Sequence, residues 1–255
     1  MSNLKNIFNN LKLPISKSTT KQKTKSSGSR GFLLIIILLA LIAAAVFFGF
    51  RAYQGISMDP QQLLNTALAN TFSANTYTFK SKSVLYMAGE ERVFSVLQGE
   101  KSGENRHIQG SILGTDVNIY NINDTIYQQD PVGGSWNVVE NKDLASLALL
   151  ITETDPEENY RFKDIGEVNY LGKEKIEGEN TRKIEFYPVL EDEWIERYFK
   201  DITFTLWVSG GSNPHIVKAV ISGVSKENSD AKLVIENYFA DLGEDITIAT
   251  PLAGN

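Results

Sequence analysis

The 255-residue chain contains no cysteine and only two histidines. The absence of cysteine excludes a disulfide framework, a thiolate metal site and lipid attachment at an N-terminal cysteine. The histidines, His107 and His215, are isolated from acidic clusters in the sequence, whereas a metal site needs several ligands together. We therefore expect neither a metal nor a cofactor, and we interpret both histidines as exposed or structural.

Catalytic sequence patterns are also lacking. The chain has no Gly-x-Ser-x-Gly motif for a hydrolase nucleophile. The segment 166–173 resembles a phosphate-binding loop only superficially, because it has one residue too many between its glycines and is followed by Glu174 instead of Ser or Thr. We interpret it as a hairpin. Acid pairs such as Glu157-Glu158 lie in predicted turns, where a solvated face is expected. We predict no enzymatic activity and no catalytic residues.

Acidic residues are absent from the first 58 residues, whereas residues 1–30 carry seven basic side chains. All 31 acidic residues lie from Asp59 onward. Eight of the 25 basic residues precede residue 52, which leaves residues 52–255 with 31 acids against 17 bases, a net charge of −14. Because an acidic domain repels phosphates, we expect no binding to nucleic acid.

One long apolar run, Gly31–Phe50, has no charged or polar side chain over twenty residues. As a helix it would be about 30 Å long, which matches the hydrocarbon core of a bilayer. It is longer than the apolar region of a cleaved signal peptide, so we predict an uncleaved signal-anchor. Residues 1–30 are predicted to be a disordered tail. Since positive side chains stay in the cytoplasm, we expect this tail on the cytoplasmic side of the cell membrane and residues 52–255 on the outer side.

A connector, 51–58, leads into the domain that we expect at 59–251, followed by a short tail, 252–255. A helix is predicted from Asp59, as N-cap, and Pro60 to about Thr71. Six segments with strand-like alternation follow, separated by short turns, and this pattern is typical of an antiparallel meander. They are Tyr77–Tyr86, Arg92–Gly99, Arg106–Leu113, Asp116–Ile122, Thr125–Gln129 and Trp136–Val139.

The second half begins with Leu144–Ile151, whose sequence LASLALLI is apolar on all sides of a helix. Such a helix is buried or lies over an apolar cavity. A charged helical insert is expected at Glu191–Lys200. Together the elements predict an α+β domain with one antiparallel sheet of about nine to eleven strands and helices on one face. Its later strands are predicted at Phe162–Leu171, Lys173–Glu179, Arg182–Pro188, Asp201–Ser209, His215–Val224 and Ala231–Leu242.

Five segments of the outer domain carry a family resemblance. They are the opening helix 60–72, NTYTF at 75–79, YLGKEKIEG at 170–178, FTLWV at 204–208 and NYF at 237–239. Over about residues 60–251 the chain resembles the LolA-like superfamily, which includes periplasmic lipoprotein carriers and the mycobacterial LppX/LprG-type lipid-binding proteins. The resemblance implies a strongly curved antiparallel sheet, an unclosed barrel, with helices and an apolar cavity on its concave face and no catalytic residues. Those relatives have a cleaved signal or a lipidated cysteine, whereas this chain has a predicted membrane span, and a tethered protein cannot diffuse between membranes.

Two functions are consistent with these features. The first is a membrane-tethered extracytoplasmic module that binds a lipid or lipoprotein acyl chain in an apolar cavity. The second is an extracytoplasmic sensor or assembly subunit of the same fold that binds an envelope protein partner and has a filled core. An empty apolar interior would favour the first and a packed one the second. The residues predicted to line the cavity are Leu144, Leu147, Ala148, Ile151, Phe204, Leu206, Leu233 and Ile235.

Overall fold

A computed structural model of the protein describes residues 59–139, 156–191 and 193–252. The predicted membrane segment Gly31–Phe50, the tail that precedes it and the predicted helix Leu144–Ile151 lie outside these residues. Within the described ranges, no helix is both long and apolar enough to cross a membrane.

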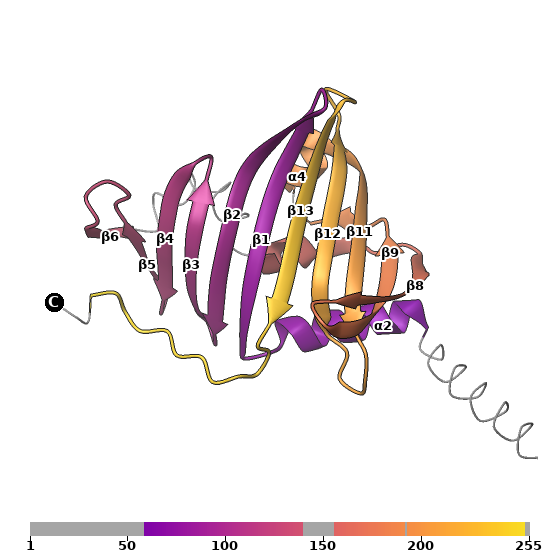
Figure 1. The fold of residues 1–255 in the computed structure, drawn as a ribbon, viewed down its shortest axis with the longest axis horizontal. Coiled ribbons are helices and arrows are strands. Elements are labelled where there is room, and N and C mark those ends of the chain that lie inside the picture. Colours follow the sequence, from indigo (N-terminus) through magenta and orange to yellow (C-terminus); the bar gives the residue numbers. More distant parts are fainter. Residues whose placement is uncertain (1–58, 140–155, 192, 253–255) are drawn as a thin grey trace, which may run out of the picture. The chain divides into compact units, whose positions relative to one another are not determined.

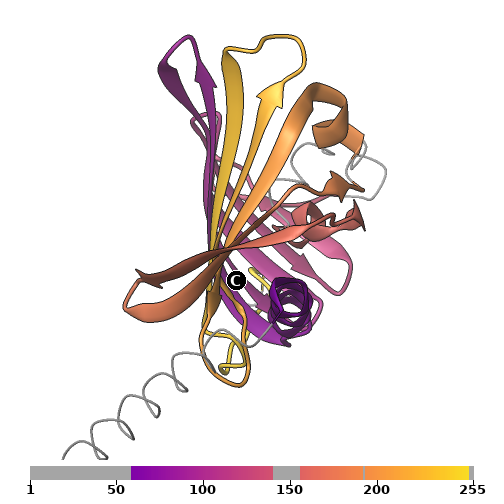
Figure 2. The same ribbon diagram turned by 90° about the vertical axis from the view of Figure 1, so that its right-hand side faces the viewer.

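Eleven antiparallel strands form one curved, open sheet (Figures 1 and 2). The order is β6-β5-β4-β3-β2-β1-β13-β12-β11-β9-β8, so the last strand pairs with the first at the centre of the sheet. The two edge strands, β6 and β8, do not meet, and the barrel is therefore unclosed, as the sequence predicted. The strands are β1 (Thr76–Met87), β2 (Glu90–Ser102), β3 (Asn105–Ile112), β4 (Thr115–Ile122), β5 (Thr125–Gln129), β6 (Trp136–Val139), β8 (Val168–Ile176), β9 (Glu179–Phe186), β11 (Phe199–Ser209), β12 (Ile216–Ser225) and β13 (Ala231–Ala240).

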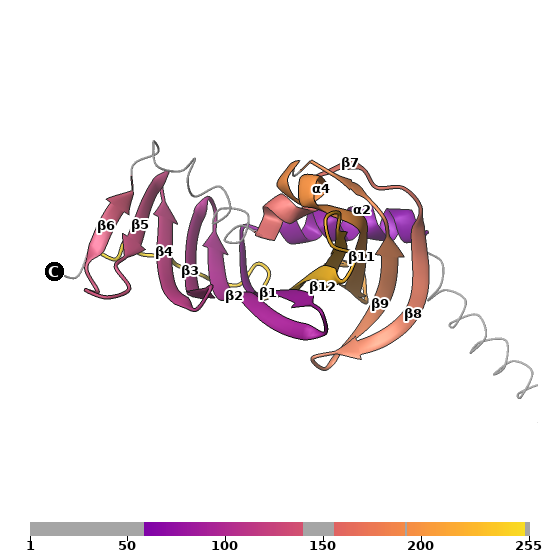
Figure 3. The same cartoon turned by 90° about the horizontal axis from the view of Figure 1, so that it is seen from above.

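Among the described residues, short elements pack on the concave face of this sheet and lie over one half of it (Figure 3). Helix α2 packs on β8, β11 and β12, and α4 packs on β11. We call this half, formed by β1, β13, β12, β11, β9 and β8, the helix-covered half. The covering elements are α2 (Pro60–Phe72), the 3₁₀-helix η2 (Pro156–Tyr160), α4 (Glu193–Tyr198) and a small two-stranded ribbon, β7 (Phe162–Asp164) with β10 (Val189–Leu190).

Helix α2 has almost the predicted bounds. Pro60 occupies its first turn, where the missing N–H costs nothing. Leu63 and Leu64 are fully buried on the sheet side. The expected cap is wrong in one respect, because the Asp59 side chain makes no capping hydrogen bond.

The predicted strands of the meander are confirmed to within three residues at each end. The prediction fails at Gly172, which was interpreted as a turn between two strands of a hairpin. Strand β8 instead continues through Gly172, where the register shifts and φ is +118°, a backbone conformation that glycine adopts without strain. The turn into β9 comes later, at Glu177 and Gly178, and the predicted strand 162–171 is divided between β7 and β8.

Candidate functional site on the concave face

Four of the predicted cavity-lining residues lie among the described residues, and all four are buried on the concave face. Phe204 and Leu206 on β11 are fully buried, and Leu233 and Ile235 on β13 are 8% and 4% exposed. They belong to one continuous hydrophobic core. The other four predicted residues, Leu144, Leu147, Ala148 and Ile151, lie outside the described part of the chain.

Around Phe204 the interior is filled by aromatic rings. The Phe204 ring centroid lies 5.2 Å from that of Phe162, 5.3 Å from Phe186 and 5.9 Å from Tyr160. These separations are typical of packed aromatic pairs. Tyr160 also lies 4.9 Å from Phe72 at the end of α2. The space between β11 and the elements above it is therefore occupied by side chains of the protein itself.

The apolar concave surface continues beyond this half, onto strands over which no described helix lies (Figure 3). One side chain of β2 and two each of β3 and β4 are buried there, with 2–9% exposure, and belong to the same core. Phe79 of β1 joins the two regions, because its ring lies over Gly99 of β2, where an added Cβ would be 2.5 Å from the ring. We call this surface the β2–β4 strip. Its members are Leu97, Ile108, Ile112, Val117 and Ile119.

The sequence analysis did not identify the β2–β4 strip as a site. The signal was present as strict alternation, since Ile108 and Ile112, and likewise Val117 and Ile119, are separated by polar residues or glycine. Strand register then brings the two pairs together, because Ile108 lies opposite Ile119. The missing information was which half of the sheet the helices would cover.

A charged cluster lies at the border between the strip and the helix-covered half. Glu157 of η2 accepts hydrogen bonds from the Tyr77 hydroxyl (2.7 Å) and the Lys101 ammonium (2.8 Å), and Arg106 Nη2 lies 3.1 Å from its second oxygen. The three donors are aligned on β1, β2 and β3, since Lys101 pairs with both Tyr77 and Arg106 in the ladder. We call these four residues the Glu157 cluster. The interpretation of Glu157 as a solvated turn residue is therefore wrong, because three strands supply its partners.

Burial by itself would raise the pKa of Glu157. The hydrogen bonds from Lys101 and Tyr77, together with the charges of Lys101 and Arg106, outweigh this effect and hold its pKa below the ordinary value. Lys101 also donates to the carbonyl oxygen of Phe72 at the end of α2 (3.2 Å), where a cation is favourable. The cluster thus fastens both η2 and α2 to the sheet beside the β2–β4 strip.

Two buried amide oxygens lie close to this border, Asn159 Oδ1 and Asn237 Oδ1, and neither has a hydrogen-bond partner among the described residues. Asn237 donates through Nδ2 to the Tyr160 hydroxyl (3.1 Å). Burial raises the pKa of Tyr160, so its hydroxyl is neutral at physiological pH. An unsatisfied buried acceptor costs about 1–3 kcal/mol. These oxygens are therefore acceptors for any donor that enters the interior.

The histidines occupy structural positions in the described part of the chain. Nε2 of His107 lies 3.0 Å from Asn118 Oδ1, and Nδ1 of His215 lies 2.9 Å from Ser209 Oγ. Ser209 is buried and its Oγ also accepts the backbone N–H of His215, so it is not presented to a substrate. His215 shares a surface pocket with several carboxylates, but no three metal-binding side chains converge within the described ranges.

Residues 73–234 match a family described as predicted periplasmic protein (DUF2092), and this range is more than half of the chain. The chain belongs to the DUF2092 family. The family description supports an extracytoplasmic location for the domain, in agreement with the sequence prediction. No curated protein sequence matches the chain.

Similar solved structures include LprF from Mycobacterium bovis, with 14% identity, a TM-score of 0.48 and coverage of 75% of this chain and 96% of that one. The lipoprotein LppX from Mycobacterium tuberculosis has 13% identity and a TM-score of 0.48, and the match covers 75% of this chain and 100% of LppX. The LolA superfamily protein NE2245 from Nitrosomonas europaea has 12% identity and a TM-score of 0.32, and the match covers 75% of this chain and 96% of NE2245. The curved, unclosed antiparallel sheet agrees with the LolA-like recognition made from the sequence.

Proposed function

We propose that the protein is a membrane-tethered extracytoplasmic module that binds an acyl chain of a lipid or lipoprotein on its concave face. The observation that carries this proposal is the β2–β4 strip, a set of buried apolar side chains, 2–9% exposed, that continues the core onto strands over which no described helix lies. An acyl chain is the ligand that matches a long surface of aliphatic side chains, and each methylene it buries contributes about 0.8 kcal/mol.

The predicted lining residues of β11 and β13 remain part of this proposal as the border of the apolar surface. Leu233 lies opposite Leu85 of β1, and from there the surface extends over β1 toward β2. Phe204 is surrounded by rings, so we place the chain over Leu97, Ile108 and Val117 instead of between Phe204 and α2. The unsatisfied oxygens of Asn159 and Asn237 then offer acceptors to a polar group at the end of the acyl chain.

The tether is the apolar segment Gly31–Phe50, which we propose to span the membrane once with residues 1–30 in the cytoplasm. The positive charges of that tail and the absence of acids from it support this orientation. Protease added to intact spheroplasts should then digest residues 52–255. Protection of the domain until the membrane is broken would refute the orientation.

The same proposal makes the protein a binding module and not an enzyme, with no cofactor. The aromatic packing around Phe204 favours a second candidate, a sensor or assembly subunit that binds an envelope protein, because a filled interior leaves no room for a ligand there. The two candidates differ in whether the β2–β4 strip carries lipid.

The test is to purify the full-length protein in CHAPS, a detergent without an acyl chain, and to analyse organic extracts by mass spectrometry. The matched control is a chimera that carries residues 1–58 in front of an unrelated soluble domain. We expect lipid bound to the native protein well in excess of the amount that the control retains. Equal amounts on both proteins would refute acyl-chain binding by the domain and favour the protein-binding candidate.

A further inference from the structure

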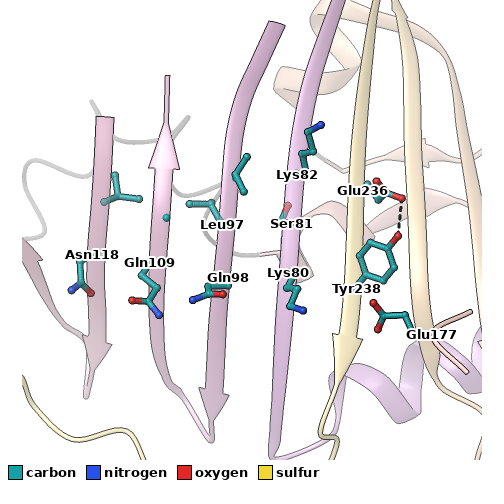
Figure 4. A pocket seen from close by; sticks show the side chains of 13 residues that line it. Lys80, Ser81, Lys82, Leu97, Gln98, Gln109, Asn118, Glu177, Glu236 and Tyr238 are labelled. Carbon is teal, nitrogen blue, oxygen red and sulfur yellow. Dashed lines mark hydrogen bonds between the residues drawn. The ribbon is translucent and has the colours of Figure 1, made fainter. Parts of the chain in front are cut away.

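The convex face of the sheet carries a straight row of polar side chains on neighbouring strands. Lys80 of β1 lies directly opposite Gln98 of β2, and Gln98 lies opposite Gln109 of β3. Gln109 in turn lies opposite Asn118 of β4. Figure 4 shows the three amides side by side, with Lys80 and then Tyr238 of β13 continuing the line. We call Gln98, Gln109 and Asn118 the amide row.

The amide row forms the floor of a groove of about 720 Å³. Val96 and Lys82 line one side of it, and Glu177 in the β8–β9 turn lines it near Tyr238. A second, smaller hollow of about 180 Å³ shares Lys80, Gln98 and Gln109 with the first and extends toward His107. The groove is therefore an elongated surface that crosses several strands at right angles.

The amides differ in how they are held. Asn118 is fixed at both ends of its side chain, since Oδ1 lies 3.0 Å from His107 Nε2 and Nδ2 donates to Gln129 Oε1 (3.1 Å). His107 is itself stacked on Tyr120, with ring centroids 4.0 Å apart. Gln98 and Gln109 are exposed and have no side-chain hydrogen bond within the described structure. The groove thus has an ordered end and two amides that are available to a ligand.

The charges around the groove are balanced. Lys82 pairs with Glu91 at 3.0 Å, and Glu236 pairs with Lys218 and accepts a hydrogen bond from Tyr238. Lys80 and Glu177 also line the groove, so its lining carries two positive and two negative side chains, and this balance does not favour phosphates or other anions. Side-chain amides donate and accept equally, which suits a ligand that offers both kinds of group without net charge.

We propose that this groove binds an uncharged glycan with N-acetylated sugars. Neighbouring strands lie about 4.8 Å apart, so the amide row offers a hydrogen-bonding side chain at nearly the spacing of successive sugars in an extended β-linked chain. Hydroxyl and acetamido groups each present a donor and an acceptor, which matches Gln98 and Gln109. Tyr238 and His107 border the row with ring surfaces that can contact the apolar faces of sugars.

The test is calorimetric titration of the full-length protein in detergent with N-acetylglucosamine hexasaccharide. The variant carries Gln98→Ala and Gln109→Ala together. The matched control carries Gln61→Ala and Gln62→Ala on α2, which replaces two glutamines away from the groove. We expect the wild type and the control to bind equally and the groove variant to bind at least tenfold more weakly with an unchanged melting temperature.

Three results would overturn the proposal. The first is failure of the wild type to bind the hexasaccharide, and the second is binding by the groove variant as tight as that of the wild type. The third is a loss of affinity in the α2 control as large as that in the groove variant. None of these results bears on acyl-chain binding, because the amide row and the β2–β4 strip lie on opposite faces of the same strands.

Discussion

The two halves of the concave face have the same kind of apolar side chains but different cover. In the helix-covered half, α2, η2, β7 and α4 close over the sheet, and the Phe204 rings are packed at 5–6 Å. Over β3 and β4 the apolar alternation is as regular, yet no helix of the described structure lies above it. A sheet must bury its apolar face against another element. We therefore expect stability to depend mainly on the helix-covered half, whereas our proposal places acyl-chain binding in the other half.

The Glu157 cluster marks the border between the two halves. Its partners come from the last covered strand, β1, and from β2 and β3, while Glu157 itself belongs to a covering element. A carboxylate that is only 21% exposed and has three polar partners is costly to disrupt. The cluster therefore holds the edge of the helical layer in place beside the strip, over which no helix of the described residues lies.

We expect the largest loss of stability from a substitution in the helix-covered half. Phe204→Ala removes a fully buried ring from three neighbouring rings and should lower the free energy of unfolding by about 3–5 kcal/mol. Urea unfolding of the purified protein measures this loss. Tyr187→Ala is the matched control, since the Tyr187 ring is 57% exposed and should leave stability nearly unchanged. A loss below about 1 kcal/mol for Phe204→Ala would show that this half is not tightly packed.

A smaller loss of stability is expected from a substitution in the Glu157 cluster, at the border between the two halves. Glu157→Gln keeps the shape of the side chain but leaves Lys101 and Arg106 without their carboxylate, so unfolding should become easier by about 1.5–3 kcal/mol, the range for hydrogen bonds to charged groups. Glu90→Gln is the control, because the Glu90 side chain is 76% exposed and its ion pair with Arg92 is long, at 3.8 Å. If both substitutions have equally small effects, the Glu157 cluster does not fasten η2 to the sheet.

The pH dependence of stability gives a second test of the Glu157 cluster. The folded-state pKa of Glu157 lies below its unfolded value of 4.5, so its contribution is fully present above pH 4.5 and is lost as the pH falls through the folded-state pKa. We therefore compare the free energies of unfolding of the wild type and of Glu157→Gln in urea between pH 7 and pH 3. The difference between the two proteins should narrow only below pH 4.5. A difference that stays constant down to pH 3 would contradict the lowered pKa.

Much of the fold could be predicted because its signals are local. The alternation in β1 to β6 and the Pro60 start of α2 identified these elements within a few residues. The failure at Gly172 has a physical reason. A glycine at positive φ serves a bulge within a strand as well as a turn between strands, and only the pairing of β8 with β9 distinguishes the two.

The candidate site was less accessible from the sequence because it depends on register and coverage. The alternation around Ile108 was visible, but only the sheet order places that strand outside the helix-covered half. Glu157 looked like a solvated acid because its partners lie about 50 to 80 positions away in the sequence. Long-range pairing of this kind leaves no mark on neighbouring residues.

The most direct test of acyl-chain binding by the β2–β4 strip is photo-crosslinking in living cells that express the full-length protein and are fed a diazirine-bearing fatty acid. Mass spectrometry then locates the labelled peptides in the wild type, in Val117→Trp, which blocks the strip, and in Val93→Trp, an exposed valine on β2 used as control. We predict labelling of β2–β4 peptides in the wild type and in Val93→Trp, and its loss in Val117→Trp. Because Val117 is only 9% exposed, the larger ring should lower the melting temperature, and cooperative unfolding of Val117→Trp shows that the variant is still folded. Labelling confined to the apolar segment 31–50 in all three proteins would contradict the account.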